Sequence, residues 1–460
     1  MQPPTPILET TPNPVTWTPD SWRNRPVTQQ PCYQDEEVLE ACLCQLCRLP
    51  PLVVPEEVEA LRRHIADASS GKRFMLQGGD CAEQFADCTP EAISDKLRIL
   101  LQMSVVITHG GRRSVFQVGR IAGQYAKPRS KDTELTDGVE LPSYRGDLIN
   151  SAEASVAARR PDPRRMVEAY FHASSTLNHL RALVVGGFAD LHHPERWDLP
   201  GSTRNIEAYR RILEQVRESI DFIDAIAGTR GTYLRTGEFF TSHEALLLPY
   251  EEALTREDAG GGIHYNLGAH MLWVGERTRR LDGAHIEYLR GIRNPIGVKL
   301  GPSVSTEEVR ELLTALDPEK EAGRLVLIPR LGADRVRDTL PKLIQAVQAS
   351  GHPVLWSCDP MHGNGLVTAL GLKTRDFDQI LAELRESLEL HRALGSNLGA
   401  VHFELTGQEV TECLGGSQQL SEVDLHRAYE TGCDPRLNQT QSLEMAFLIA
   451  EMLGERATRL

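Results

Sequence analysis

The sequence predicts an α/β protein built as a (β/α)8 TIM barrel, with an N-terminal extension and a helical insertion between strands 2 and 3. From residue 73 onward, short apolar runs alternate with longer amphipathic stretches, the pattern of β/α units around a parallel sheet. Eight such runs occur, which is the number of strands that closes this kind of barrel. More than a hundred residues separate the second run from the third, far more than one crossover requires.

The eight expected strands are short and rich in apolar residues. They are residues 73–79, 114–119, 232–237, 270–275, 296–301, 324–330, 353–358 and 400–405. Two helix starts also have sequence signals. Ser303 is expected to cap the helix that follows the fifth run, and Asn438 the closing helix at 439–453.

The chain is expected to divide into an N-terminal extension at 1–70, a flexible Pro/Thr-rich arm followed by a helix, and a catalytic barrel at 71–460. Inserted helices are expected at about 150–230, within the barrel segment. Residues 164–185 and 205–227 carry the helical pattern. We expect the extension and the insertion to make regulatory or subunit contacts.

Composition excludes several classes of protein. The net charge of -14 argues against general affinity for nucleic acid, so an anionic substrate needs a local basic pocket. No apolar run approaches the roughly 20 residues that span a bilayer, and no secretory signal is visible, which together favour a cytoplasmic enzyme with no membrane partner. Nine scattered cysteines predict reduced thiols, and the CxxC at Cys44 and Cys47 is interpreted as two buried thiols of a helix.

Reactive side chains gather where the expected strands end. Because the carboxyl ends of barrel strands meet at one face, we expect these residues to lie together. In strand order they are Cys81, Arg120, Glu276, Arg277, Lys299, Arg330, His362 and Glu404, with Asp434 beyond the last strand. Taken singly, each is more often structural; their shared position at one face favours a functional site.

The residue types form two sets with different chemistry. Cys81, His362, Glu404 and Asp434 offer a mixed soft and hard ligand set for a divalent transition metal such as Mn, Fe, Co or Zn. The arginines and the lysine suit phosphate and carboxylate groups. A Lewis acid beside an anion pocket indicates a small phosphorylated substrate and a carbonyl group to be polarised.

Long segments of the chain resemble the type II 3-deoxy-D-arabino-heptulosonate 7-phosphate (DAHP) synthases of plants and bacteria. The resemblance runs from about Trp22 to the C-terminus. Its segments are SWRNRPVTQQPCY, LQGGDCAE, VGRIAGQYAKPRS, LPSYRGD, TSHEALLL, WVGERTR, NPIGVKLGP, CDPMHGN, ELTGQEVTECLGG and CDPRLN. So many long segments in the same order make the resemblance specific.

The resemblance implies roles for individual residues. Cys81, His362, Glu404 and Asp434 would bind the metal, with Mn²⁺ favoured and Co²⁺ as the alternative. The residues implied around phosphoenolpyruvate are Arg120, Glu276, Arg277, Lys299 and Arg330. The KPRS segment would bind erythrose 4-phosphate, with Lys127 near the aldehyde and Arg129 and Ser130 near its phosphate. Lys127, Glu276 and Lys299 are the catalytic candidates, with Glu276 handling a proton of water.

The resemblance also implies partners and leaves other readings open. A homo-oligomer, a dimer or tetramer, is implied, and feedback effectors or a chorismate mutase are possible partners. The alternatives are another synthase that joins phosphoenolpyruvate to an aldose phosphate, such as an octulosonate-phosphate synthase, a metal-dependent class II aldolase, and a non-catalytic regulatory relative. Retention of all four expected ligands argues against the last.

Two local features carry their own expectations. Gly365 stands after CDPMHGN where the family usually has Thr, so loop packing or substrate positioning near the seventh strand is expected to differ. Cys433 precedes the expected ligand Asp434, and a ligand at Cys81 would bring the two thiols close. We therefore expect that oxidation can form a Cys81–Cys433 disulfide that weakens metal binding.

Overall fold

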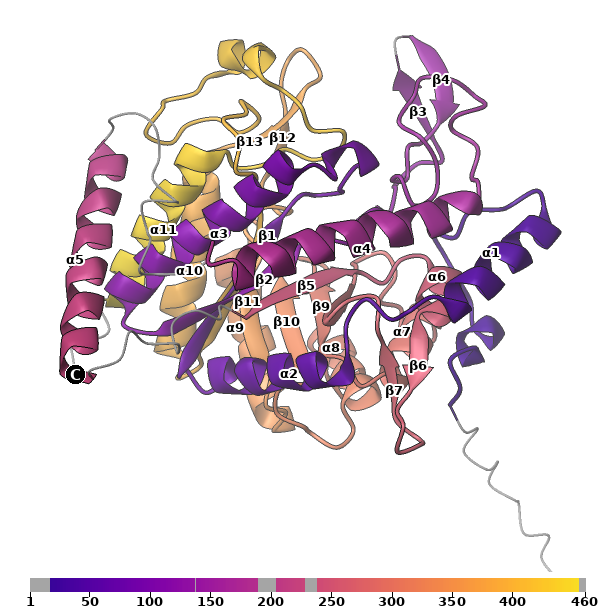
Figure 1. The fold of residues 1–460 in the computed structure, drawn as a ribbon, viewed down its shortest axis with the longest axis horizontal. Helices are drawn as coiled ribbons and strands as arrows, with labels where there is room; N and C mark the ends of the chain where they lie inside the picture. The colour runs from indigo at the N-terminus through magenta and orange to yellow at the C-terminus, as the bar shows by residue number, and fades with distance from the viewer. Residues whose placement is uncertain (1–16, 137, 189–203, 228–237, 455–460) are drawn as a thin grey trace, which may run out of the picture.

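Eight parallel strands close into a barrel in the computed structural model, which describes residues 17–136, 138–188, 204–227 and 238–454 (Figure 1). Around the barrel the strands follow chain order, and the last pairs with the first. They are β1 (Arg73–Gly79), β2 (Ser114–Arg120), β5 (Phe239–Glu244), β8 (Met271–Val274), β9 (Ile296–Leu300), β10 (Leu325–Pro329), β11 (Leu355–Cys358) and β14 (Leu398–Glu404). The predicted (β/α)8 barrel is confirmed.

Seven of the eight predicted runs match barrel strands to within two residues at either end. Strands β9, β10 and β14 are buried along their whole length. A parallel sheet enclosed by helices has no face in water, so its strands form continuous apolar runs that the sequence displays directly.

The third strand was predicted in the wrong place. Residues 232–237 lie outside the described residues, and β5, which pairs with β2 and β8, begins two residues later. Its sequence FFTSHE is too polar to stand out as an apolar run. The barrel tolerates these buried polar groups because they find partners: Ser242 Oγ accepts a hydrogen bond from Gln77 Nε2 and donates one to the carbonyl oxygen of Gly119.

Helices follow the strands and cover the outside of the barrel. They are α3 (Pro90–Gly111), α6 (Leu248–Ala253), α7 (Ala284–Gly291), α8 (Thr306–Leu316), α9 (Val336–Ser350), α10 (Phe377–Ala393) and α11 (Gln439–Gly454). Asn438 Oδ1 accepts from the Gln441 amide at 2.8 Å, as predicted for the cap of α11. The predicted cap of α8 was wrong by two residues, because Ser303 lies in the turn after β9 and Ser305 accepts from the Glu308 amide.

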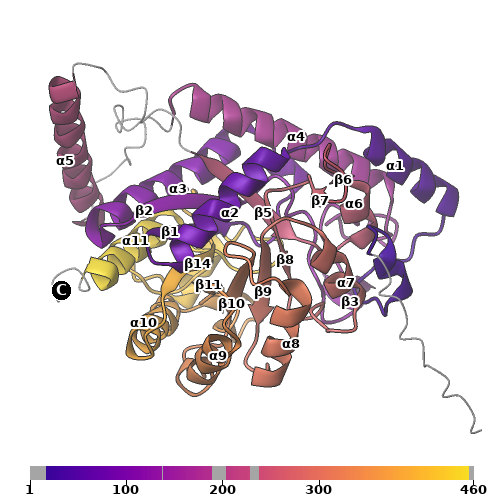
Figure 2. The same cartoon turned by 90° about the horizontal axis from the view of Figure 1, so that it is seen from below.

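The N-terminal extension holds a short 3-10 helix, η1 (Ser21–Asn24), and two helices, α1 (Glu36–Arg48) and α2 (Pro55–Ser69). Helix α2 crosses the amino end of the barrel (Figure 2). Its Leu61 and Ile65 belong to one buried cluster with interior residues of the barrel such as Phe116. Residues 1–16 of the expected arm lie outside the described residues. The division into extension and catalytic barrel stays a prediction.

The insertion between β2 and β5 contains the two predicted helices, α4 (Arg164–Val185) and α5 (Arg204–Ala227). Helix α1 packs on α4 and α6 through a face that buries Cys42 and Leu46. The CxxC cysteines, Cys44 and Cys47, are therefore helical as expected but exposed, which corrects the expectation that they are buried.

Three antiparallel hairpins extend the loops: β3 (Thr133–Thr136) with β4 (Val139–Pro142), β6 (Thr255–Glu257) with β7 (His264–Asn266), and β12 (Gly365–Val367) with β13 (Lys373–Arg375). The β3–β4 and β12–β13 hairpins stand on the side of the barrel opposite α2 (Figure 1). They flank the carboxyl ends of the strands. Among the described residues, no helix is both long and apolar enough to cross a membrane.

Candidate active site

Two connected sets of residues line cavities at the carboxyl ends of the strands. The larger cavity, of about 960 Å³, is lined by the β3–β4 and β12–β13 hairpins and includes Arg129 and Ser130. The narrower one, of about 80 Å³, is lined by all the other predicted site residues. A further pocket of about 640 Å³ lies among Ser69, His352 and Asn397, near the amino ends of β1, β11 and β14, and none of the predicted residues lines it.

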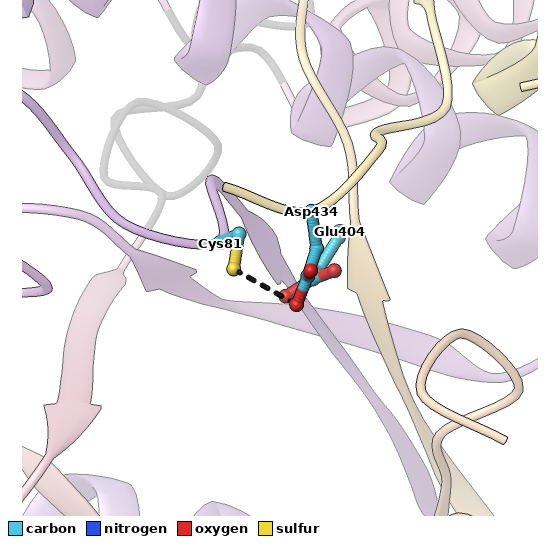
Figure 3. Close-up of side chains that lie close together, drawn as sticks. All are labelled: Cys81, Glu404 and Asp434. Atoms are coloured by element: carbon cyan, nitrogen blue, oxygen red, sulfur yellow. Dashed lines mark hydrogen bonds between the residues drawn. The ribbon is translucent and has the colours of Figure 1, made fainter. Parts of the chain in front are cut away.

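Three of the four expected metal ligands form one compact group. A ligand atom of each of Cys81, Glu404 and Asp434 lies within 4.8 Å of the other two, and Cys81 Sγ is 3.6 Å from Asp434 Oδ2 (Figure 3). Bonds of about 2.0–2.3 Å to a transition metal place its ligand atoms at such separations. The group comes together because Cys81 follows β1, Glu404 ends β14, and these two strands are paired.

The fourth expected ligand, His362, joins the group through Glu404. Its Nε2 lies 3.0 Å from Glu404 Oε1, and its Nδ1 lies 2.8 Å from Asp359 Oδ2. A carboxylate that accepts the Nδ1 proton orients the ring and leaves Nε2 for a metal. Asp359 belongs to the same CDPMHGN segment as the histidine, so sequence and geometry place both parts of this arrangement together.

The electrostatics of the group fit a divalent cation. Although burial acts in the opposite direction, the neighbouring His362 and Arg375 hold the pKa of the Glu404 carboxyl well below its usual range. The pKa of Asp434 is likewise lowered, against its burial, by Lys127. Two carboxylates, an imidazole and a thiol thus form a donor set that suits Mn²⁺, Co²⁺ and related metals.

Lys127 connects the metal ligands to the predicted phosphate-binding segment. Its Nζ lies 2.8 Å from Cys81 Sγ and also donates to Asp434. Two residues later, Arg129 forms an ion pair with Glu134 of β3, and Ser130 Oγ accepts from Arg277 Nη2 at 2.5 Å. The segment therefore runs from the ligand group out to the larger cavity.

The predicted anion-binding residues divide into buried and exposed groups. Arg120 is 2% exposed and donates to His402 Nε2 at 2.6 Å, to Glu404 Oε1 at 3.1 Å and to the Asp80 carbonyl oxygen at 2.9 Å. Lys299 is also buried, pairs with Asp359, and has its pKa lowered to about 8 by burial.

The remaining predicted anion-binding residues lie at neighbouring strand ends and line the cavities. Arg330 donates through Nη2 to the His362 carbonyl oxygen at 2.6 Å, and Arg277 is exposed at the wall shared by both cavities. Glu276 lines the narrower cavity, but its carboxylate is engaged by Arg279 at 2.8 and 3.0 Å and by the Gly301 amide at 2.7 Å.

The structure adds residues that the sequence interpretation missed. Glu244 ends the true third strand, lines the narrower cavity, and has an Oε1 atom without a hydrogen-bond partner among the described residues. Burial raises the pKa of this carboxyl. From β13, Arg375 Nη2 lies 2.7 Å from Glu404 Oε2 and Lys373 Nζ lies 3.0 Å from Asp434 Oδ1. The basic pair in KTR was the only sequence signal for these two.

Gly365 is the first residue of β12 and lines the larger cavity. A Cβ atom added there would meet no atom within 4 Å, so the missing side chain leaves no gap in the packing of the loop. The expected change in loop packing therefore finds no support in the structure. A side chain at this position would face open space in the cavity, which leaves substrate positioning as the property it can affect.

Comparison with known proteins agrees with this geometry. The model of the Class-II DAHP synthetase family matches residues 17–450. A phospho-2-dehydro-3-deoxyheptonate aldolase of Streptomyces coelicolor is 50% identical over 439 residues, covering 95% of this chain and 97% of the relative. A protein of the same name from Neurospora crassa is 46% identical, over 96% of this chain and 95% of its own length. The phospho-2-dehydro-3-deoxyheptonate aldolase AroG of Mycolicibacterium smegmatis is 48% identical, over 95% of this chain and 94% of its own length. The chain belongs to the class-II DAHP synthetase family.

Proposed function

We propose that this protein is a metal-dependent 3-deoxy-7-phosphoheptulonate synthase, a transferase that condenses phosphoenolpyruvate with D-erythrose 4-phosphate. The products are DAHP and inorganic phosphate, and the reaction is the first step of the shikimate pathway to the aromatic amino acids. The observation that carries the proposal is a Cys–His–Glu–Asp ligand group in contact with buried arginine and lysine side chains in one cavity. The names of the relatives support the same reaction.

Phosphoenolpyruvate, with its phosphate and carboxylate, fits the cationic wall of the narrower cavity. We assign Arg120, Lys299, Arg277 and Arg330 to these anionic groups, since all four line this cavity. Guanidinium groups bind both kinds of anion through paired hydrogen bonds. Fixing the substrate in this way supplies a large part of the rate acceleration. Two reactants that are already held in line lose little further translational and rotational entropy in the transition state.

Erythrose 4-phosphate is assigned to the larger cavity. Arg129 and Ser130 would hold its phosphate, and Lys127 would place its ammonium group at the aldehyde oxygen. A divalent metal, Mn²⁺ or Co²⁺, held by Cys81, His362, Glu404 and Asp434 would supply a Lewis acid for that carbonyl.

The bond changes follow from the substrates. C3 of phosphoenolpyruvate forms a bond to the aldehyde carbon, whose oxygen takes up a proton, with Lys127 as the nearest donor. Water adds at C2, and the C2–O bond to phosphate then breaks. Glu276 was the expected acceptor of the water's proton. Glu244 is better placed for this, because one of its oxygens is free among the described residues whereas both oxygens of Glu276 are engaged.

One assay tests the proposal against its alternatives. Protein loaded with Mn²⁺ is incubated with phosphoenolpyruvate and either erythrose 4-phosphate or the five-carbon aldehyde arabinose 5-phosphate, and phosphate release and the sugar product are measured. We expect turnover with the four-carbon aldehyde only. Preference for the five-carbon aldehyde would indicate an octulosonate-phosphate synthase. Aldol chemistry without phosphoenolpyruvate would indicate a class II aldolase, and no turnover a non-catalytic relative.

Assembly, location and regulation remain proposals as well. We infer a homo-oligomer, a dimer or tetramer, in the cytoplasm, with feedback effectors or a chorismate mutase as further partners.

The rate should fall at alkaline pH because of Lys299. Burial lowers the pKa of this lysine to about 8, so the free protein loses the positive charge as the pH rises through that value. A neutral amine no longer attracts an anion, and kcat/KM for phosphoenolpyruvate, which reports on free protein, should decrease above about pH 8. A pH series of kcat/KM checks this. In Lys299→Arg the decrease should move to higher pH; an unchanged profile in that variant would assign the titration to another group.

Oxidation should inactivate metal-free protein reversibly. The thiols of Cys81 and Cys433 are neighbours, and the interaction with Cys81 lowers the pKa of Cys433 to about 6. A peroxide oxidant would take two electrons and two protons from the pair, forming the disulfide and leaving no thiol at position 81 for the metal. Peptide mapping without reduction should find this bridge. Cys433→Ser should resist the oxidant, and equal sensitivity of this variant would exclude the bridge as the cause.

A further inference from the structure

Glu383 lies on α10, away from the strand ends, yet its carboxylate reaches the backs of two active-site loops. The side chain is 1% exposed. Its Oε1 accepts from the Leu331 amide at 2.8 Å and its Oε2 accepts from Asn364 Nδ2 at 2.7 Å. The neighbouring Gly332 amide also favours the charged form of this carboxyl, and so acts to lower its pKa. One side chain thus contacts the loop that follows β10 and the loop that follows β11.

Each of these loops carries a residue assigned to the site. Leu331 follows Arg330, which is assigned to phosphoenolpyruvate, and Asn364 is two residues after His362, which is assigned to the metal. The two loops also touch directly, because Arg330 Nη2 donates to the His362 carbonyl oxygen at 2.6 Å. Glu383 therefore holds both loops from the side opposite the cavity.

Backbone packing shows how closely the loops fit together. A Cβ atom on Gly363 would lie 2.2 Å from the Gly332 nitrogen, so only glycine allows this approach. Gly332 itself has φ +89, a backbone conformation that residues with a side chain rarely adopt. The Ala333 amide donates to Asn364 Oδ1 at 3.0 Å, which fixes the Asn364 amide with its Nδ2 toward Glu383.

A buried carboxylate of this kind is costly to the fold. No Lys, Arg or His side chain forms an ion pair with Glu383 among the described residues, and burial raises its pKa to about 8. Burying a polar group in this way destabilises the fold unless its hydrogen bonds are made, and an apolar side chain of similar size would fill the same space without that cost. Its neighbours are three N–H donors, which require an acceptor on both oxygens.

We propose that Glu383 is a positioning residue that sets the distance between Arg330 and His362, and so aligns the phosphoenolpyruvate site with the metal site. The proposal rests on the function proposed above for those two residues. Glu383 does not touch substrate or metal; it acts through the Leu331 and Gly332 amides on one loop and through Asn364 on the other. Loss of this support should weaken the binding of Mn²⁺ and of phosphoenolpyruvate together.

Glu383→Gln is the first variant. Whichever way the new amide turns, one of its N–H groups faces an N–H donor of Asn364 or of the 331–332 backbone, so the loops must separate. We expect the dissociation constant for Mn²⁺, measured by calorimetry on metal-free protein, and the KM for phosphoenolpyruvate each to rise about tenfold, as is usual when a group behind a metal ligand is lost. The unfolding temperature should stay within about a few degrees of that of the parent protein.

The charge-swapped variant Glu383→Gln/Asn364→Asp is the decisive rescue. Its glutamine can accept from the 331–332 amides and donate to the new aspartate, whose second oxygen still accepts from Ala333. The Pro360 carbonyl oxygen, which now accepts from Asn364 Nδ2 at 2.8 Å, loses its donor and faces an aspartate oxygen instead. Part of the loss in Mn²⁺ affinity and in KM should therefore be reversed. Glu389→Gln, an exposed glutamate of the same helix, is the matched control and should change neither constant.

Gly363→Ala tests the same coupling without altering Glu383, and should also raise both constants, because its Cβ forces the two loops apart. Wild-type Mn²⁺ affinity and KM in Glu383→Gln, or a lowered unfolding temperature with both constants unchanged, would overturn the proposal. So would a double variant no better than the single one. Mn²⁺ affinity is measured without turnover, so the outcomes for Mn²⁺ binding still test the proposal if the protein fails to make DAHP, which would overturn only the proposed function.

Discussion

Removal of the divalent metal is expected to lower the rate of condensation by at least about a thousandfold, and addition of Mn²⁺ or Co²⁺ to restore it. That factor corresponds to about 4 kcal/mol of transition-state stabilisation, within what a Lewis acid supplies to a developing alkoxide. Among the described side chains, several cations contact the ligand group, and of these Lys127 is assigned to the aldehyde. A single ammonium group cannot replace a doubly charged ion. Turnover of chelator-treated protein, with metals added back one at a time, measures the effect.

Variants distinguish a specific loss of metal binding from general damage to the protein. Cys81→Ser and Asp434→Asn each change one atom type in the group of three and should weaken Mn²⁺ binding strongly. Cys47→Ser changes an exposed thiol outside the site and serves as the control. Full turnover in protein shown by elemental analysis to be free of metal would contradict the assignment.

The barrel was predictable because its physical cause is visible in the sequence. Strands buried on both faces are mainly apolar, and seven of them appear as short runs in which apolar residues predominate, between helical stretches. The one error, at the third strand, had the opposite cause: Thr241, Ser242 and His243 of β5 are buried polar residues that depend on distant partners such as Gln77 and Glu251. From the sequence alone, a buried polar residue of a strand cannot be distinguished from an exposed one, because its hydrogen-bond partners are not known.

That error had a consequence for the site. Most of the site residues were found because strand ends converge, and the rule works wherever the strand is placed correctly. Glu244 ends the strand that was misplaced, so the carboxyl with the free oxygen was passed over and Glu276 was chosen instead. The resemblance supplied Lys127, Arg129 and Ser130, which lie in a loop that no strand pattern identifies.

Other contacts depend on how loops fold back over the barrel. Arg375 comes from the β12–β13 hairpin and Glu383 from a helix, yet both reach the loops around the ligand group. Neither position carries a local signal, because a lone arginine or glutamate in an amphipathic stretch is usually a solvated residue. The helix start at Ser305, two residues from the predicted cap at Ser303, shows the same limit on a small scale, since two serines compete and the turn geometry decides.

Arg120→Ala is expected to have the second largest effect, and to act on both activity and stability. Its guanidinium group is assigned to phosphoenolpyruvate and also contacts Glu404, His402 and the Asp80 carbonyl oxygen. Loss of a buried, hydrogen-bonded charge costs about 4 kcal/mol in binding, so kcat/KM for phosphoenolpyruvate should fall about a thousandfold. The same contacts predict a loss of the order of 3 kcal/mol in the free energy of unfolding, because acceptors are left buried without a donor.

Arg277→Ala separates the two effects of Arg120. Arg277 carries the same charge in the same cavity, but its side chain is exposed and donates a hydrogen bond to Ser130. Its removal should weaken phosphoenolpyruvate use while leaving the unfolding temperature unchanged, since few surface substitutions alter stability by more than about 0.5 kcal/mol. Steady-state kinetics and thermal unfolding of both variants measure this contrast. Because Arg120 also holds Glu404, Mn²⁺ affinity should fall in Arg120→Ala and not in Arg277→Ala; equal Mn²⁺ affinity in the two would show that Arg120 serves the substrate alone.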